Sequence, residues 1–186
     1  MLFSTLALFA ASLLGSALAK PEQIRGVRDP IYHLHLQAHP TNASLPVLGP
    51  EATSERFDIS TTIRSVNTTM YLNVGTESTS YKSLTFGTTA STDSWGLEGD
   101  TIMTKPGSAL GRRELQSVSF SFFSRAVSWR SARFTNRIAN LCHADLNFVV
   151  CRLEGSFWRL WLQTGSDMPS GNSCSNYQTI HLPCLC

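Results

Sequence analysis

Apolar and polar residues alternate with a period of two along much of the chain, and this pattern restricts the fold more than any other feature of the sequence. Phe57, Ile59 and Ile63 alternate with polar neighbours, and Leu72 and Val74 do the same. Successive side chains of a strand point to opposite faces of a sheet, so such segments predict half-buried antiparallel strands. The expected strands cover residues 32–37, 57–63, 70–74, 81–86, 95–97, 146–151, 157–162 and 179–182. About eight short strands separated by turn residues predict a mainly β fold, either an antiparallel β-sandwich or a small closed barrel.

The first nineteen residues have the composition of a secretory signal peptide. Residues 2–18 contain no charged side chain, and Ala17-Leu18-Ala19 precedes Lys20. The strongest apolar stretch, residues 6–14, is much shorter than the roughly 20 residues of a membrane-spanning helix. Cleavage and export are therefore expected, to the extracellular space or cell wall, with no membrane partner. Residues 20–30 are expected to be a flexible N-terminus, and residues 31–186 a single β-rich domain.

One segment, residues 107–144, differs from the rest in composition and is treated as a basic insert. Six Arg and a single acidic residue, Glu114, lie between residues 112 and 144, whereas the remainder of the chain is slightly acidic. The insert is interpreted as a basic amphipathic helix, as an irregular surface loop, or as a translated intron of a faulty gene model. The abrupt change in composition modestly favours the intron, and a transcript that retains every codon would contradict it. No nucleic-acid partner is expected.

The chain contains five cysteines, so an exported, oxidised protein would leave one unpaired. Cys142 lies in the basic insert and is expected to be the unpaired one. The other four allow three pairings, which the sequence does not distinguish. A bridge between Cys151, on a predicted strand, and Cys174, in a loop rich in Gly, Asn and Ser, is favoured. A second bridge between Cys184 and Cys186 would be strained, and the absence of paired CxxC spacings argues against a metal site.

Two sequons match the acceptor for N-glycosylation, Asn42-Ala43-Ser44 and Asn67-Thr68-Thr69. Both lie in polar, turn-like stretches between predicted strands, where a glycan would project into solvent. Glycosylation of Asn42 and Asn67 is therefore expected.

The sequence offers no clear catalytic constellation. His33 and His35 would share one strand face and could chelate copper or zinc, but a solvated strand face is the favoured interpretation. His181 is interpreted as another outward histidine. A glycosidase needs two opposed carboxylates, and no spacing selects a pair; no nucleophile elbow, phosphate-binding glycine loop or metalloprotease helix is present. No catalytic residue and no cofactor are predicted. The carboxylates considered are Asp58, Glu77, Asp93, Glu98 and Asp100.

The aromatic residues of segment 157–162 give the only positive indication of binding. Trp158 and Trp161 would lie on opposite faces of a regular strand, so that one anchors the core and the other faces outward near Arg159. An exposed Trp beside Arg can stack on a sugar ring or on a partner side chain. Coverage of both rings by neighbouring loops is the favoured alternative.

The blocks Phe148-Val149-Val150-Cys151, Phe157-Trp158-Arg159-Leu160-Trp161 and Ser173-Cys174-Ser175-Asn176 together resemble the C-terminal half of small secreted ascomycete proteins that carry an uncharacterised β-rich domain of unknown function. The resemblance implies a compact extracellular β domain, a Cys151–Cys174 bridge and no catalytic residues. Residues 107–144 have no counterpart in that pattern, and the Cys184-Leu185-Cys186 ending is unusual.

These observations predict a secreted fungal β-rich protein of unknown molecular function, non-enzymatic and acting at the cell wall or host interface. Its partner would be a cell-wall polysaccharide or a host protein. The alternatives are a secreted carbohydrate-binding module and a secreted hydrolase or metal-dependent enzyme.

Overall fold

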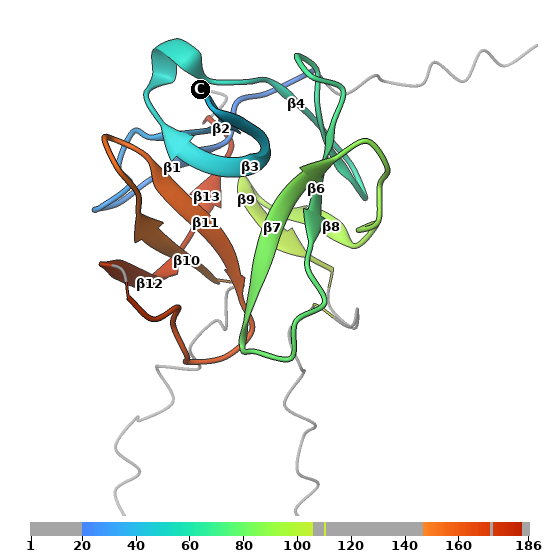
Figure 1. The fold of residues 1–186 in the computed structure, drawn as a ribbon. Helices are drawn as coiled ribbons and strands as arrows, with labels where there is room; N and C mark the ends of the chain where they lie inside the picture. The colour runs from blue at the N-terminus through green and yellow to red at the C-terminus, as the bar shows by residue number, and fades with distance from the viewer. Residues whose placement is uncertain (1–19, 106–109, 111–146, 172, 184–186) are drawn as a thin grey trace, which may run out of the picture.

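The computed structural model describes residues 20–105, 110, 147–171 and 173–183 (Figure 1). This part of the chain contains thirteen strands, one 3-10 helix and no α-helix. Among these residues no helix has the length and apolar character needed to cross a membrane. The strands are β1 (Arg25–Gly26), β2 (His35–His39), β3 (Asn42–Gly49), β4 (Phe57–Ile59), β5 (Ile63–Ser65), β6 (Tyr71–Val74), β7 (Tyr81–Gly87), β8 (Trp95–Glu98), β9 (Thr101–Thr104), β10 (Asn147–Arg152), β11 (Trp158–Gln163), β12 (Cys174–Gln178) and β13 (Ile180–His181); the 3-10 helix η1 spans Glu51–Thr53.

The strands form one antiparallel sheet that nearly closes into a barrel. The order is β4-β5-β6-β7-β11-β3-β2-β1-β13-β9-β8. The two ends of this order meet, because the Trp95 backbone amide at the start of β8 donates to the Thr61 carbonyl in the turn between β4 and β5, at 3.0 Å. The predicted mainly β fold is confirmed.

Strand β11 occupies the junction of the sheet. One of its edges pairs with β10 along the whole strand, from Arg152–Trp158 to Asn147–Gln163. Its other edge is shared, because the N-terminal half pairs with β3 and the C-terminal half with β7. Strand β12 then extends the sheet beyond β10.

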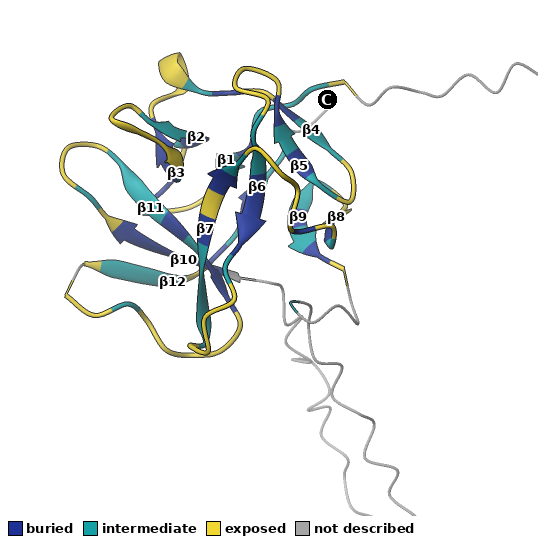
Figure 2. Ribbon diagram, turned by 45° about the vertical axis from the view of Figure 1, so that its right-hand side comes forward, coloured by how far each residue is buried: buried dark blue, intermediate teal, exposed yellow. Residues whose placement is uncertain are grey.

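Alternation along the strands separates a continuous apolar core from an outer face. Leu160 and Leu162 of β11 are fully buried in this core, and Trp161 between them points outward. Trp95 is the largest fully buried side chain among the described residues, and its indole N–H donates to the Leu72 carbonyl at 2.9 Å. Figure 2 shows the buried residues along the strands and the exposed ones mainly in the connecting loops.

Residues 57–63 form a hairpin rather than the single strand expected from the pattern. Strands β4 and β5 pair with Ile59 opposite Ile63, and the Ser60 amide donates to the Thr62 carbonyl at 2.9 Å within the turn. A three-residue turn keeps the period-two parity, so Ile59 and Ile63 face the same core. The alternation therefore passes through the turn without interruption.

The expectation of a flexible N-terminus at residues 20–30 is wrong. Ile24 is fully buried, and its carbonyl accepts a 2.8 Å hydrogen bond from the Leu36 amide. Glu22 exchanges two backbone hydrogen bonds with Phe57, at 3.0 and 2.8 Å. Gly26 allows the Ile31 backbone to approach so closely that a Cβ would clash with it. The segment, with β1 between β2 and β13, belongs to the barrel. The basic insert, residues 107–144, lies outside the described residues apart from Leu110.

Candidate functional site

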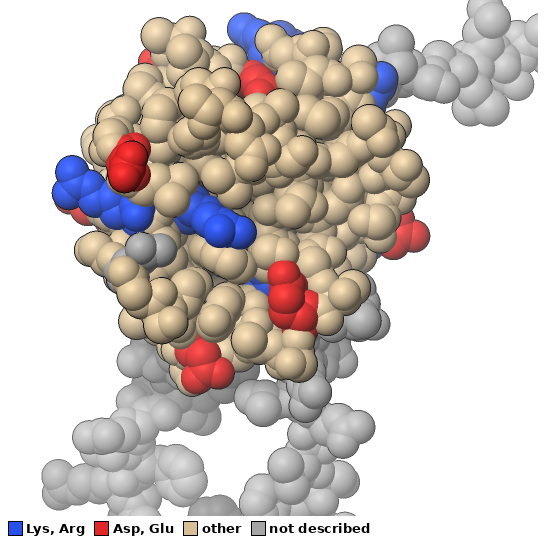
Figure 3. Space-filling view, in the orientation of Figure 1, with Lys and Arg blue, Asp and Glu red and all other residues tan. Residues whose placement is uncertain are grey.

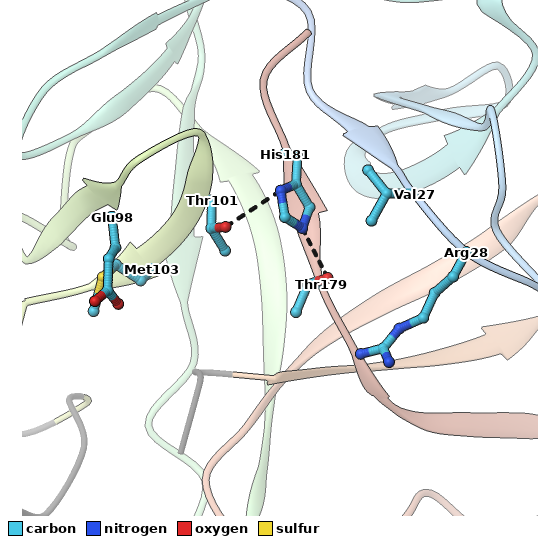
Figure 4. Close-up of a pocket in the computed structure, with 7 residues that line it drawn as sticks. All are labelled: Val27, Arg28, Glu98, Thr101, Met103, Thr179 and His181. Atoms are coloured by element: carbon cyan, nitrogen blue, oxygen red, sulfur yellow. Dashed lines mark hydrogen bonds between the residues drawn. The ribbon is translucent and has the colours of Figure 1, made fainter. Parts of the chain in front are cut away.

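A pocket with a volume of about 520 Å³ opens where β13 lies between β1 and β9 (Figure 4). Outward-pointing residues of adjacent strands converge there, because His181 pairs with Arg25 on one side and with Thr101 on the other. The pocket is lined by Val27, Arg28, Glu98, Thr101, Met103, Thr179 and His181.

His181 is the centre of a hydrogen-bond chain in this pocket. Its Nδ1 lies 3.2 Å from the Asp100 carboxylate and 3.2 Å from the Thr101 hydroxyl, and its Nε2 lies 2.9 Å from the Thr179 hydroxyl. An ionised carboxylate only accepts hydrogen bonds, so Nδ1 carries the proton. In the neutral ring Nε2 is then an acceptor, and the Thr179 hydroxyl donates to it. The chain runs from hydroxyl to imidazole to carboxylate.

The local sequence explains the position of each residue in this hydrogen-bond chain. Thr179 and His181 are two residues apart on an extended segment, so their side chains share a face. Asp100 follows Gly99 in the two-residue turn that joins β8 to β9, and Gly99 has φ +61°, which glycine adopts without strain. The Leu182 amide donates to the Asp100 carbonyl at 2.8 Å and fixes this turn beside β13.

Side chains of opposite charge lie on either side of this hydrogen-bond chain. In the view of Figure 4, Glu98 and Arg28 lie on opposite sides of His181. One Arg28 Nη donates to the Tyr177 carbonyl, which ties the segment after β1 to β12. Val27 and Met103 add apolar surface. The pocket thus offers donors and acceptors around a partly apolar lining. In the described part of the chain no three His, Cys, Asp or Glu side chains are grouped in a way that could hold a metal ion.

The aromatic residues of β11 separate as the alternation predicts. Trp158 packs against the core, and Trp161 lies on the outer face. The Arg159 guanidinium lies 4.0 Å from the centroid of the Trp161 ring, and the Tyr81 ring meets the same indole edge-on at 5.5 Å. Trp161 is therefore partly covered by Arg159 and only half-buried, and Trp158 is not part of the outer surface.

His33 and His35 do not share a strand face as expected. His33 precedes β2 with φ +58°, whereas His35 lies on β2 with only 4% of its surface exposed. The expected solvated strand face is therefore wrong for His35. Desolvation by burial lowers its pKa, and the nearby Glu51 carboxylate opposes this effect. His39 instead packs edge-on against Phe157, at 5.2 Å.

Cys151 and Cys174 are joined by a disulfide bond, the pairing favoured by the sequence. They are direct register partners on β10 and β12. Cys142, Cys184 and Cys186 lie outside the described residues, so the second bridge stays a prediction.

Both sequon asparagines are exposed. The Asn42 side-chain oxygen accepts from the Ser44 amide at 3.1 Å, and that of Asn67 accepts from the Arg56 amide at 3.1 Å. Their glycosylation stays a prediction.

The carboxylates considered from the sequence do not gather in one place. Asp100 and Glu98 belong to the pocket or its turn, whereas Glu77 accepts from the Ser83 hydroxyl on the outer face of the sheet. That hydrogen bond lowers the pKa of Glu77, although desolvation opposes it.

Sequence reasoning missed the pocket because its members come from distant segments. The Thr-x-His spacing and the Gly-Asp turn are weak local signals, and only the β13–β9 pairing brings them together. Comparison with protein-family models, curated proteins and solved structures gives no match for this chain. Function therefore has to follow from the chemistry of the site itself.

Proposed function

We propose that this chain is an extracellular binding protein that acts at a cell wall or host surface and holds the end of a neutral, hydroxyl-rich glycan in the pocket around His181. The observation that supports it best is the pocket itself, a concave site with convergent polar groups. Export is supported by the predicted leader and is compatible with the Cys151–Cys174 disulfide.

The lining suits a polyol. Sugar hydroxyls both donate and accept, and the pocket provides a carboxylate acceptor in Glu98 and a cationic donor in Arg28. Val27 and Met103 can contact the apolar C–H surface of a sugar ring. Several hydrogen bonds to charged groups, each of modest net strength, give the weak to moderate affinity of a single binding site.

Calorimetric titration with neutral β-glucan and chitin oligomers tests this function. We expect Glu98→Gln and Arg28→Gln each to weaken binding about fivefold to tenfold, because each removes a charge-assisted hydrogen bond. Glu154→Gln, an exposed carboxylate outside the pocket lining, is the matched control. Equal affinities for all three variants and the unmodified protein would refute the pocket as the binding site.

A second function is favoured by one specific observation, the Thr179–His181–Asp100 chain, which has the connectivity of a hydrolase triad. In that mechanism the Thr179 oxygen attacks the acyl carbon of an ester while His181 Nε2 takes the hydroxyl proton. The alcohol leaves with that proton, and water then hydrolyses the acyl-threonine and restores the hydroxyl.

Turnover separates the two functions. If the protein is an esterase, it should release p-nitrophenol from p-nitrophenyl acetate and acquire an acetyl group on Thr179 that mass spectrometry detects. The rate of hydrolysis should fall by more than about a hundredfold in Thr179→Ala. Thr85→Ala, an exposed threonine on β7, is the control. A binding protein should show no hydrolysis that depends on Thr179.

A further inference from the structure

Three side-chain nitrogens on the outer face of β11 are buried and have no hydrogen-bond partner among the described residues. They are Arg159 Nε, Trp161 Nε1 and Gln163 Nε2. The three residues are spaced two apart, so they lie in a row on one face of the strand. Native proteins leave few buried donors unsatisfied, and each such donor calls for an explanation.

Arg159 is the charged residue of this row. Its guanidinium forms no ion pair and donates no hydrogen bond within the described part of the chain, although the residue is half-buried. Its guanidinium carbon lies 4.0 Å from the centroid of the Trp161 ring. Desolvation lowers the pKa of Arg159, and the Glu77 carboxylate opposes this effect without reaching salt-bridge distance. The guanidinium is thus half-buried against the Trp161 ring, with its Nε shielded and no acceptor among the described residues.

Packing explains part of this arrangement. Val47 and Cys151, the register partners of Arg159, and Val149, the partner of Trp161, are almost fully buried on the outer face. Arg159 and Trp161 lie directly beside them on the same face. Covering an apolar layer needs an aliphatic or aromatic side chain, however, and does not need a row of unpaired donors.

We propose that this face binds the carboxylate groups of an acidic polysaccharide, with Arg159 as the central contact. A guanidinium binds a carboxylate through two parallel hydrogen bonds, and the aromatic neighbours Trp161 and Tyr81 offer apolar edges to sugar rings. Among the described residues, the large apolar side chains that are exposed all lie outside β7 and β11, which favours a polysaccharide over the apolar centre of a protein interface. They are Tyr32, Val66, Leu97, Met168 and Tyr177.

The face has the charge distribution that such a ligand needs. Figure 3 shows basic atoms over β11, acidic atoms near the lower part of β7, and a mostly uncharged surface around them. A guanidinium on a mostly uncharged surface can bind one carboxylate per sugar repeat without strong selection by total charge. This site is distinct from the pocket, so its test does not depend on the function proposed for His181.

Titration of the whole secreted protein with oligogalacturonate tests the proposal, with neutral galactose oligomers and poly-glutamate as comparison ligands. We expect oligogalacturonate to bind and the two comparison ligands to bind at least about tenfold more weakly. Arg159→Gln should lose about tenfold or more in affinity, and Arg152→Gln, an exposed arginine of the neighbouring strand, should lose none.

Glu77→Gln keeps the packing and removes the competing negative charge, so it should bind oligogalacturonate about twofold to fivefold more tightly. The melting curve of Arg159→Gln shows whether that variant folds. If it does not fold, Glu77→Gln still tests the proposal. Absence of binding by the unmodified protein, or binding unchanged in both Arg159→Gln and Glu77→Gln, overturns the proposal. Equal binding of poly-glutamate would overturn the choice of a polysaccharide in favour of an acidic protein.

Discussion

His35 is a residue whose burial has a direct consequence for stability. Only 4% of its surface is exposed, its Nδ1 has no hydrogen-bond partner in the part of the chain that the structure describes, and burial lowers its pKa. An unfolded chain protonates this histidine near pH 6.5, whereas the folded chain resists protonation. Above that pH both states are neutral and His35 has no effect on the pH dependence. As the pH falls through 6.5 the unfolded state gains the proton first, so the folded state loses stability.

We therefore expect the free energy of unfolding to decrease between about pH 7.5 and pH 5.5, by at most about 1.4 kcal/mol per pH unit from this group. Urea unfolding at several pH values measures the slope. His35→Gln should flatten it, and His33→Asn, which changes an exposed histidine where φ is positive, is the matched control. Parallel slopes for the unmodified protein and His35→Gln would contradict the prediction.

The same residue shows what alternation can and cannot predict. Period two correctly assigns Trp158 and Trp161 to opposite faces, because parity follows from strand geometry alone. It does not reveal that the outer face of β2 is covered. His35 and Gln37 are buried there, and Phe157 lies so close to Gly49 that a Cβ on the glycine would be 2.6 Å from the ring. Such coverage depends on strands distant in sequence.

At the scale of elements, Asn73 of β6 organises the connection between β7 and β8. Its side-chain oxygen accepts from the Ser91 and Thr92 amides at 2.9 and 3.2 Å, and its amide donates to the Thr89 carbonyl at 2.9 Å. The Thr92 hydroxyl in turn accepts from the Val74 amide at 2.9 Å. One buried side chain therefore replaces the strand pairing that this loop lacks.

Asn73→Ala should destabilise the protein by about 3 kcal/mol, because it leaves two amides and a carbonyl without partners. Chemical denaturation measures the loss. Thr85→Ala, an exposed change on the adjacent strand β7, should cost less than about 0.5 kcal/mol. A loss in Asn73→Ala no larger than in the control would mean that the loop holds its conformation without Asn73.

The Cys151–Cys174 bridge joins β10 to β12 across a sequence separation of 23 residues. Replacing both cysteines by serine should cost about 3 kcal/mol, chiefly through the larger conformational entropy of the unfolded chain. Thermal unfolding of the double variant measures this. An unchanged melting temperature would show that β12 is held by its backbone pairing alone.

Two of the strands that the sequence does not predict, β3 and β12, have a turn-like composition. Strand β3 contains Pro46 and a sequon, and β12 contains Ser175 and Asn176, residue types that favour loops. Their partners impose the extended form, since β3 pairs with β2 and β11 and β12 pairs with β10. Tertiary pairing overrides local preference in both cases.

For the molecule as a whole, the barrel closes through strands on both sides of the basic insert. Strand β9, before it, pairs with β8 and β13, and β10, after it, pairs with β11 and β12. All these partners lie outside residues 107–144. Within the insert, Leu110 is described: it packs against the core and its carbonyl accepts from the Thr104 hydroxyl.

A chain that lacks residues 107–144 should therefore form the same barrel and the same Cys151–Cys174 bridge, with a free energy of unfolding within about 2 kcal/mol of the full chain. The lost Leu110 contact costs stability, and the shorter connection recovers part of it through a smaller loop-closure entropy. Circular dichroism, non-reducing mass mapping and urea unfolding provide the measurements. A second variant carries a short Gly-Ser linker in place of the segment. If this variant also fails to fold, the cause is not a connection too short to join β9 to β10. If neither variant folds, the insert is an integral part of the domain, and its interpretation as a translated intron is wrong.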